Sequence, residues 1–260
     1  SIGFVMFLAV IVIFSVLTYS RNNDWSSELG IWQDNVEKSP HKARPHNYLG
    51  LALTKHGRTE EAIQHFLMAL RIKPDYGDAH NNIGNALYDQ GRTEEAIKHY
   101  NQAISINSNY HQAYYSLGAT HLSNGDLENA RVALNSAIQL APDYAKAYGA
   151  LGTADQELGE IDSAINNFLQ AVTLDAKAFK IHYRLASAYN LQKQYENAKK
   201  SAKDCLNIKR NYAPAYFELG VSEKALGNKV AATDAFEKAK KDKNWRKSAQ
   251  FELDMLSKGF

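Results

Sequence analysis

Residues 77–110 read GDAHNNIGNALYDQGRTEEAIKHYNQAISINSNY. In the first half of this stretch, Ala79, Ile83 and Leu87 recur at the spacing of one face of a helix. Gly91 then interrupts the pattern, and glycine commonly ends a helix because it can adopt the conformation that the turn requires. The first half therefore predicts one amphipathic helix that ends before Gly91.

The second half predicts another helix. Thr93 is expected to cap its N-terminus, and Glu94 and Glu95 follow in the first turn, where carboxylates suit the helix dipole. Ala96 and Ala103 lie on its inner face. Small side chains at these positions allow two helices to approach closely while bulkier neighbours fill the space around them. The stretch is thus a pair of packed helices.

The same pattern recurs every 34 residues. A small residue of the first helix forms one column, at Gly50, Gly84, Gly118, Gly152, Ala186 and Gly220. An alanine lies twelve positions later in each copy, at Ala62, Ala96, Ala130, Ala164, Ala198 and Ala232. A repeat of this length buries its apolar face only against its neighbours, so we expect the copies to stack into one array.

The period, the glycine column and the alanine columns resemble the tetratricopeptide repeat family, as do Pro74 and Pro142 at the ends of second helices. The resemblance implies an all-α fold, a right-handed superhelical solenoid of six helix pairs with flanking helices. The six copies are residues 43–76, 77–110, 111–144, 145–178, 179–212 and 213–246.

Single helices are expected to close both ends of the array. Residues 21–42 are expected to hold a half repeat and its connection. Residues 247–260 are expected to form a capping helix whose apolar and polar residues alternate. The apolar residues of this helix are Ala249, Phe251, Leu253 and Leu256. A stacked array needs such an amphipathic end.

The fifth copy departs from the pattern at three positions. Ala186 replaces the column glycine, Lys193 replaces the glycine between the two helices, and Ala202 stands where other copies have an aromatic ring. We expect this copy to be the loosest and to be the place of a bend.

An apolar stretch of a different kind precedes the repeats. Ile2 to Tyr19 is 18 residues without a charge, and a helix of that length spans about 27 Å. We therefore expect residues 1–20 to form an apolar helix that lies in a membrane or is buried by neighbouring subunits. The chain begins with Ser1 rather than Met, which favours a processed product or a segment of a longer protein. The expected location is membrane-anchored, or extracellular or periplasmic after processing.

Residues 18–40, TYSRNNDWSSELGIWQDNVEKSP, carry a second resemblance. They are similar to the junction that follows the last membrane helix in polytopic transmembrane, tetratricopeptide-containing proteins related to O-mannosyltransferases. This resemblance implies a non-catalytic module that lies outside the cytoplasm.

The sequence indicates no chemistry of its own. His46, His80 and His182 share a column with tyrosines, so they are expected to pack with a ring nitrogen hydrogen-bonded, whereas His65 and His99 are expected on the surface. Basic residues near the C-terminus are mixed with acidic ones, which argues against nucleic acid. We expect no enzyme activity, no cofactor, no metal ligands, no nucleic-acid partner, and a buried, unreactive Cys205.

The resemblance implies that the first helices line a concave groove. The predicted groove residues are Asn47, Tyr48, Asn81, Asn82, Asn85, Tyr115, Tyr183, Arg184 and Phe217. Asparagine amides can pair with the backbone of an extended segment, and the aromatic rings can add apolar contact. The alternative is that the amides are hydrated or bond to one another.

These features predict a non-enzymatic scaffold that binds proteins or peptides, including copies of itself. Residues 1–192 carry 15 Lys and Arg against 19 Asp and Glu, and residues 193–260 carry 15 against 9, which suits head-to-tail self-association into a filament. Two alternatives remain open. The chain is an extracytoplasmic module of a membrane glycosyltransferase-like protein, or it is a membrane-anchored, peptide-binding adaptor.

Overall fold

The computed structural model of the protein describes residues 27–258. The apolar helix predicted within residues 1–20 lies outside these residues. In the described part of the chain, no helix is both long enough and apolar enough to cross a membrane.

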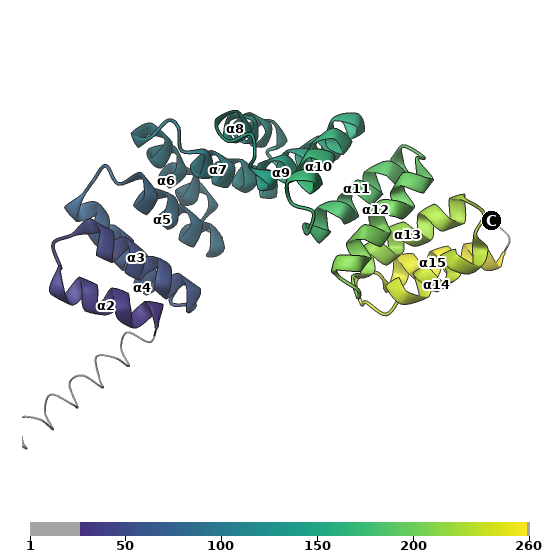
Figure 1. Ribbon diagram of the computed structural model, residues 1–260, viewed down its shortest axis with the longest axis horizontal. Coiled ribbons are helices and arrows are strands. Elements are labelled where there is room, and N and C mark those ends of the chain that lie inside the picture. Colours follow the sequence, from purple (N-terminus) through teal and green to yellow (C-terminus); the bar gives the residue numbers. More distant parts are fainter. Residues whose placement is uncertain (1–26, 259–260) are drawn as a thin grey trace, which may run out of the picture. The chain divides into compact units, whose positions relative to one another are not determined.

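Between residues 27 and 258 the structure consists of fourteen helices joined by short turns (Figure 1). The chain divides into two units between Ala113 and Tyr114. The first unit contains α2 (Glu28–Lys38), α3 (Ala43–Lys55), α4 (Thr59–Ile72), α5 (Gly77–Asp89) and α6 (Thr93–Ile106). The helix α7 (His111–Ser123) begins at its end and continues into the second unit.

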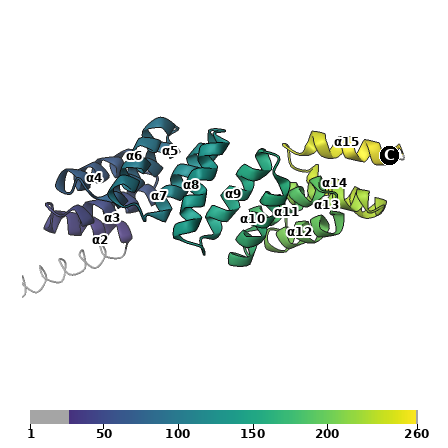
Figure 2. The ribbon, with the colours of Figure 1, turned by 90° about the horizontal axis from the view of Figure 1, so that it is seen from above.

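The second unit continues with α8 (Leu127–Leu140), α9 (Ala145–Glu157), α10 (Ile161–Leu174), α11 (Phe179–Leu191), α12 (Tyr195–Ile208), α13 (Ala213–Ala225), α14 (Lys229–Ala239) and α15 (Arg246–Ser257). Each helix from α8 to α15 packs against the next along the chain. In Figure 2, α15 lies beside α14 at the end of this unit. The predicted all-α fold of helix pairs is confirmed for the described residues.

A glycine of the first helix faces a buried side chain of the second helix in each of five pairs. A Cβ atom added at Gly84 would lie 2.5 Å from Cε1 of Tyr100, and one added at Gly220 would lie 2.6 Å from Cε1 of Phe236. Tyr100 and Phe236 are 1% and 0% exposed, so neither ring has room to move away. Glycine is therefore required for the helices to approach to this distance.

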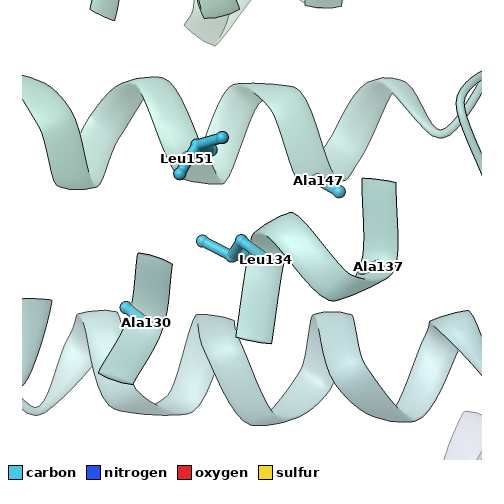
Figure 3. Close-up of a cluster of buried hydrophobic side chains, with 5 residues drawn as sticks. All are labelled: Ala130, Leu134, Ala137, Ala147 and Leu151. Atoms are coloured by element: carbon cyan, nitrogen blue, oxygen red, sulfur yellow. The ribbon is translucent and has the colours of Figure 1, made fainter. Parts of the chain in front are cut away.

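Leucine replaces the ring in the third copy. A Cβ added at Gly118 would lie 2.7 Å from Cγ of Leu134. Figure 3 shows Leu134 of α8 and Leu151 of α9 between their helices, while the alanines of this cluster lie close to the ribbons. The alanines are Ala130, Ala137 and Ala147.

The fifth copy differs from the others at both facing positions. Ala186 replaces the glycine and Ala202 replaces the ring, and both are 0% exposed. The methyl group of Ala186 on α11 is thus accommodated where the facing residue of α12, Ala202, carries no ring. The predicted looseness of this copy stays a prediction.

Two local predictions are wrong. Thr93 does not cap α6 but is its first residue; Arg92 occupies the cap position and pairs with Glu95 at 2.7 Å. Phe251, predicted on the apolar side of the capping helix, is 61% exposed, whereas Ala249 and Leu256 are buried. The reason is helical period: residues 249 and 256 are two turns apart on one face, and residue 251 lies off that face.

The predicted histidine packing is confirmed. His46 is 4% exposed and its Nε2 lies 3.0 Å from the Pro40 carbonyl oxygen. The ring nitrogen of His182 is similarly 3.1 Å from the Ala176 carbonyl oxygen. However, His65 and His99 are half-buried rather than exposed, because each lies against a histidine of the preceding helix.

The left-handed backbone of Lys193 leads to a testable stability change. The glycines that end the first helices have φ between 72° and 83°, and Lys193 takes the same position with a φ of 60°. A non-glycine residue in this conformation costs about 1–2 kcal/mol. We expect Lys193→Gly to raise the free energy of unfolding by about 1 kcal/mol in urea denaturation. Lys200→Gly inside α12 should instead lower it by about 1 kcal/mol, and a loss of stability in Lys193→Gly would contradict the strain.

The histidines of the first unit predict stability that depends on pH. Burial, as the largest cause, lowers the pKa of His65, His80 and His99 below the ordinary 6.5. The unfolded chain then takes up protons more readily than the folded chain, so stability is complete above about pH 6.5 and falls as the pH drops through the folded pKa values.

We expect the urea midpoint to be lower at about pH 5.5 than at about pH 7.5. The double variant His65→Gln, His99→Gln should lose less over the same interval, because it lacks two of the shifted groups. Equal losses in parent and variant would assign the pH dependence to other residues.

Candidate binding surfaces

The predicted amides of the first unit are mostly used within the fold. Asn47 and Asn81 are 2% and 5% exposed. The half-buried Asn82 on α5 donates from Nδ2 to Oδ1 of Asn47 on α3 at 3.0 Å, and this bond links two successive copies. Asn85 is exposed and accepts a hydrogen bond of 3.0 Å from the Tyr100 hydroxyl. Within residues 27–258, Oδ1 of Asn81 has no hydrogen-bond partner.

An aromatic surface lies beside these amides. The ring of Tyr48 on α3 stacks on Trp32 of α2, with ring centres 4.5 Å apart and planes 11° apart. The Arg44 guanidinium lies over the same ring, 5.4 Å from its centre. Tyr76 bonds to Asn47, and burial, followed by nearby Asp78 and Tyr48, raises its pKa. Tyr48 is therefore held rigidly, half-buried between a ring and a cation.

The second unit contains a hollow, here called the Arg184 pocket, with a volume of about 270 Å³. Two predicted groove residues, Tyr115 and Arg184, line it. Small residues of α9, among them Gly149 and Ala150, line it. An added Cβ at Gly149 would lie 2.7 Å from Cδ1 of Ile181, so this glycine allows α9 and α11 to approach closely. The volume of the hollow is sufficient for a side chain or a chain end of a partner.

The rim of the Arg184 pocket is basic. Its charged lining residues are three cations, Lys146, Lys180 and Arg184, and one acid, Asp175. Oδ1 of Asp175 accepts a hydrogen bond from the backbone N–H of Lys177. None of the three cations has an ion-pair partner among the described residues. Because unpaired cations around a hollow attract anions, the pocket is suited to carboxylates.

The remaining predicted groove residues do not line this pocket. Tyr183 packs against Tyr212, with ring centres 5.7 Å apart. Phe217 lies between Phe236 and Trp245, at 5.5 Å and 5.0 Å between centres. Both side chains are half-buried in contacts within the fold.

Sequence reasoning missed Lys146 and Lys180 on the pocket rim. The two lysines are 34 residues apart and so occupy the same position of successive copies. Arg44 stands in the same column of the first copy. A search for charged columns as well as apolar ones would have found them.

Two larger hollows lie elsewhere in the second unit. One, of about 440 Å³, includes Tyr195, Val221 and Leu256, and the other, of about 500 Å³, includes Tyr216 and Lys238. Neither is lined by a predicted groove residue. The Arg184 pocket is therefore the candidate in which sequence and geometry agree.

Cys205 is buried, as predicted. Burial raises the pKa of its thiol to about 11. At neutral pH the group stays a thiol, and the thiolate is the form that acts as a nucleophile.

Comparison with known families identifies the repeats. Family models described as TPR repeat or tetratricopeptide repeat match residues 50–91, 84–125, 111–144 and 150–201. Together these matches extend over more than half of the chain.

Curated relatives include O-mannosyltransferases. The chain is 35% identical over 69 residues to Protein O-mannosyl-transferase Tmtc3 of Drosophila melanogaster, and 31% identical over 70 residues to TMTC1 of Homo sapiens. The matches cover 26% and 27% of this chain and 8% of each relative. A resemblance to the repeat region of such proteins is confirmed, the resemblance at residues 18–40 stays a prediction, and the chain spans a small fraction of the length of these relatives.

Solved structures share the fold. The APC/C hetero-tetramer Cut9–Hcn1 aligns with a TM-score of 0.73 and 20% identity over 91% of this chain and 46% of that chain. Pseudomonas aeruginosa pilF aligns with a TM-score of 0.74 and 19% identity, over 81% and 97% of the two chains. YrrB, described as a TPR protein with an unusual peptide-binding site, aligns at 0.57 and 18% identity, over 71% and 95%.

Proposed function

The chain belongs to the tetratricopeptide repeat family, and from that premise we propose that it is a non-enzymatic scaffold that binds an extended, acidic segment of a partner protein. The observation that carries the proposal is the Arg184 pocket, whose three cations have no ion-pair partner among the described residues. The hollow of about 270 Å³ admits a side chain or chain end of the partner, and the cations select its charge.

The remainder of the proposed binding surface supplies contacts that do not depend on the partner's sequence. The half-buried ring of Tyr115 lies at the edge of the pocket and offers apolar area at low entropic cost. Apolar contact with this ring and charge selection by the cations together favour an acidic segment of a partner over a neutral one.

Arg184→Ala should weaken binding of an acidic peptide by about tenfold, because a hydrogen bond to a charged group contributes about 1.5–3 kcal/mol. The measurement is fluorescence anisotropy of the full chain with pools of acidic, neutral and basic peptides of equal length. The acidic pool should bind best, and less tightly at high salt.

Lys247→Ala is the matched control, since Lys247 is an exposed cation on α15, away from the pocket. It should leave acidic-peptide binding unchanged. Equal affinity for the three pools, or full binding by Arg184→Ala, would contradict the assignment.

The apolar segment Ile2 to Tyr19 supports a second element of the proposal, self-association. Eighteen uncharged residues leave no polar face for solvent, so lipid, detergent or protein must cover them. We favour coverage by neighbouring copies, with head-to-tail contacts between the acidic and basic parts of the chain. The O-mannosyltransferase relatives support the alternative of an extracytoplasmic module on a membrane anchor, and a membrane-anchored adaptor is the third arrangement.

Negative-stain microscopy of the full chain without detergent separates these arrangements. Self-association predicts filaments or large particles, and deletion of residues 2–19 should convert them into helical monomers. Particles that require detergent would assign the segment to a membrane. Monomers of the full chain without detergent would contradict both.

A further inference from the structure

Two histidine pairs in the first unit repeat with the period of the fold. Nδ1 of His46 on α3 lies 3.1 Å from Nδ1 of His65 on α4. Nδ1 of His80 on α5 lies 3.1 Å from Nδ1 of His99 on α6. The ring centres are 5.4 Å and 5.3 Å apart. The same geometry thus occurs twice, 34 residues apart.

Each pair is oriented by a backbone carbonyl. Nε2 of His46 lies 3.0 Å from the oxygen of Pro40, and His80 bonds in the same way to the backbone of Pro74. A carbonyl oxygen only accepts, so Nε2 of His46 carries the proton and its Nδ1 presents a lone pair to His65. A histidine that donates one ring N–H to a carbonyl and presents its other nitrogen is the usual arrangement of a metal ligand.

From this geometry we propose that each histidine pair chelates one divalent transition-metal ion, with Cu²⁺ bound most tightly, through the two facing Nδ1 atoms. Two nitrogens at about 2.0–2.1 Å from one ion lie about 2.8–3.4 Å apart when the angle at the metal is about 90–110°. The observed 3.1 Å lies within this interval. Imidazole suits Cu²⁺, Ni²⁺ and Zn²⁺, and affinity for divalent ions is greatest at Cu²⁺.

The proton balance of binding is simple. In the metal-free pair, His65 donates its Nδ1 proton to His46. On binding, that proton moves to Nε2 of His65, so a neutral pair releases no proton. Burial, as the largest cause, lowers the pKa of His65 and of His99, which keeps these rings neutral at pH 7.

The protein supplies two ligands per site. In the described part of the chain, no three His, Cys, Asp or Glu side chains are grouped so that they could hold a metal ion. The nearest carboxylates, Glu61 and Glu95, are engaged by Arg58 and Arg92 at 2.6 Å and 2.7 Å. Water or a partner's side chain would complete the coordination. These sites could not be predicted from the sequence, because the ligands are 19 residues apart and this spacing matches no metal motif.

The fifth copy provides an internal control. His182 bonds to the Ala176 carbonyl as His46 bonds to that of Pro40, at 3.1 Å. The position that corresponds to His65 and His99 is Ser201 in this copy. A single histidine cannot chelate, so this copy should bind no ion.

The test is titration of the full chain with Cu²⁺ alone at about pH 7.5, followed by calorimetry and electron paramagnetic resonance. His65→Gln and His99→Gln each keep an N–H donor toward the partner histidine but lose the ligand nitrogen. We expect each variant to bind about one ion fewer than the parent and the double variant about two fewer. The nitrogen signature of the bound Cu²⁺ should weaken in parallel. His182→Ala should bind as the parent does.

Lowering the pH to about 5 should release the ions, because a protonated imidazole has no free lone pair. Unchanged stoichiometry in the double variant would overturn the proposal. So would an equal loss in His182→Ala, since that result would assign binding to scattered histidines. Circular dichroism of each variant at the titration temperature checks that its helices are intact.

Discussion

The distance between the two helices of each pair depends on a glycine that faces a buried side chain. The glycines are Gly50, Gly84, Gly118, Gly152 and Gly220, and the facing residues are Phe66, Tyr100, Leu134, Phe168 and Phe236. Because no side chain separates the backbone from the facing group, the alanines around it become fully buried. Ala62, Ala96 and Ala103 are each 0% exposed. Close packing within each pair in turn fixes which residues are left on the surface.

Ion pairs between a half-exposed cation and a buried acid connect successive repeats. Arg131 on α8 contacts Asp155 on α9 at 3.2 Å, and Lys199 on α12 contacts Glu223 on α13 at 3.1 Å. Asp155 is 2% exposed, and burial raises its pKa despite the neighbouring guanidinium. Such a pair adds little net stability, but it is costly to break, so it favours the correct neighbour. The cations of the Arg184 pocket lack partners of this kind within the described residues and remain available to a ligand.

The fold could be predicted from the sequence because its signals are local and repeated. The 34-residue period gives the length of one helix pair. The turn glycines mark the turn inside each pair, and the small residues mark where its two helices approach closely. The site was harder to predict, because its contacts join different copies. Asn47 and Asn82 were placed in the groove by their columns, yet they bond to each other across two copies. His46 and His65 belong to one copy, but their facing depends on how its two helices meet, and a spacing of 19 residues does not reveal that.

The central claim is that the column glycine and the facing ring are one interlocked unit, and a double-mutant cycle at Gly84 and Tyr100 tests it most directly. Gly84→Ala should cost about 1–3 kcal/mol by overpacking, and Tyr100→Ala about 3–5 kcal/mol by leaving a cavity. The double variant has the same two residues as the fifth copy, Ala186 and Ala202. The account therefore predicts that its loss of unfolding free energy is at least about 1 kcal/mol smaller than the sum of the two single losses. Additive losses, within about 0.5 kcal/mol, would contradict it.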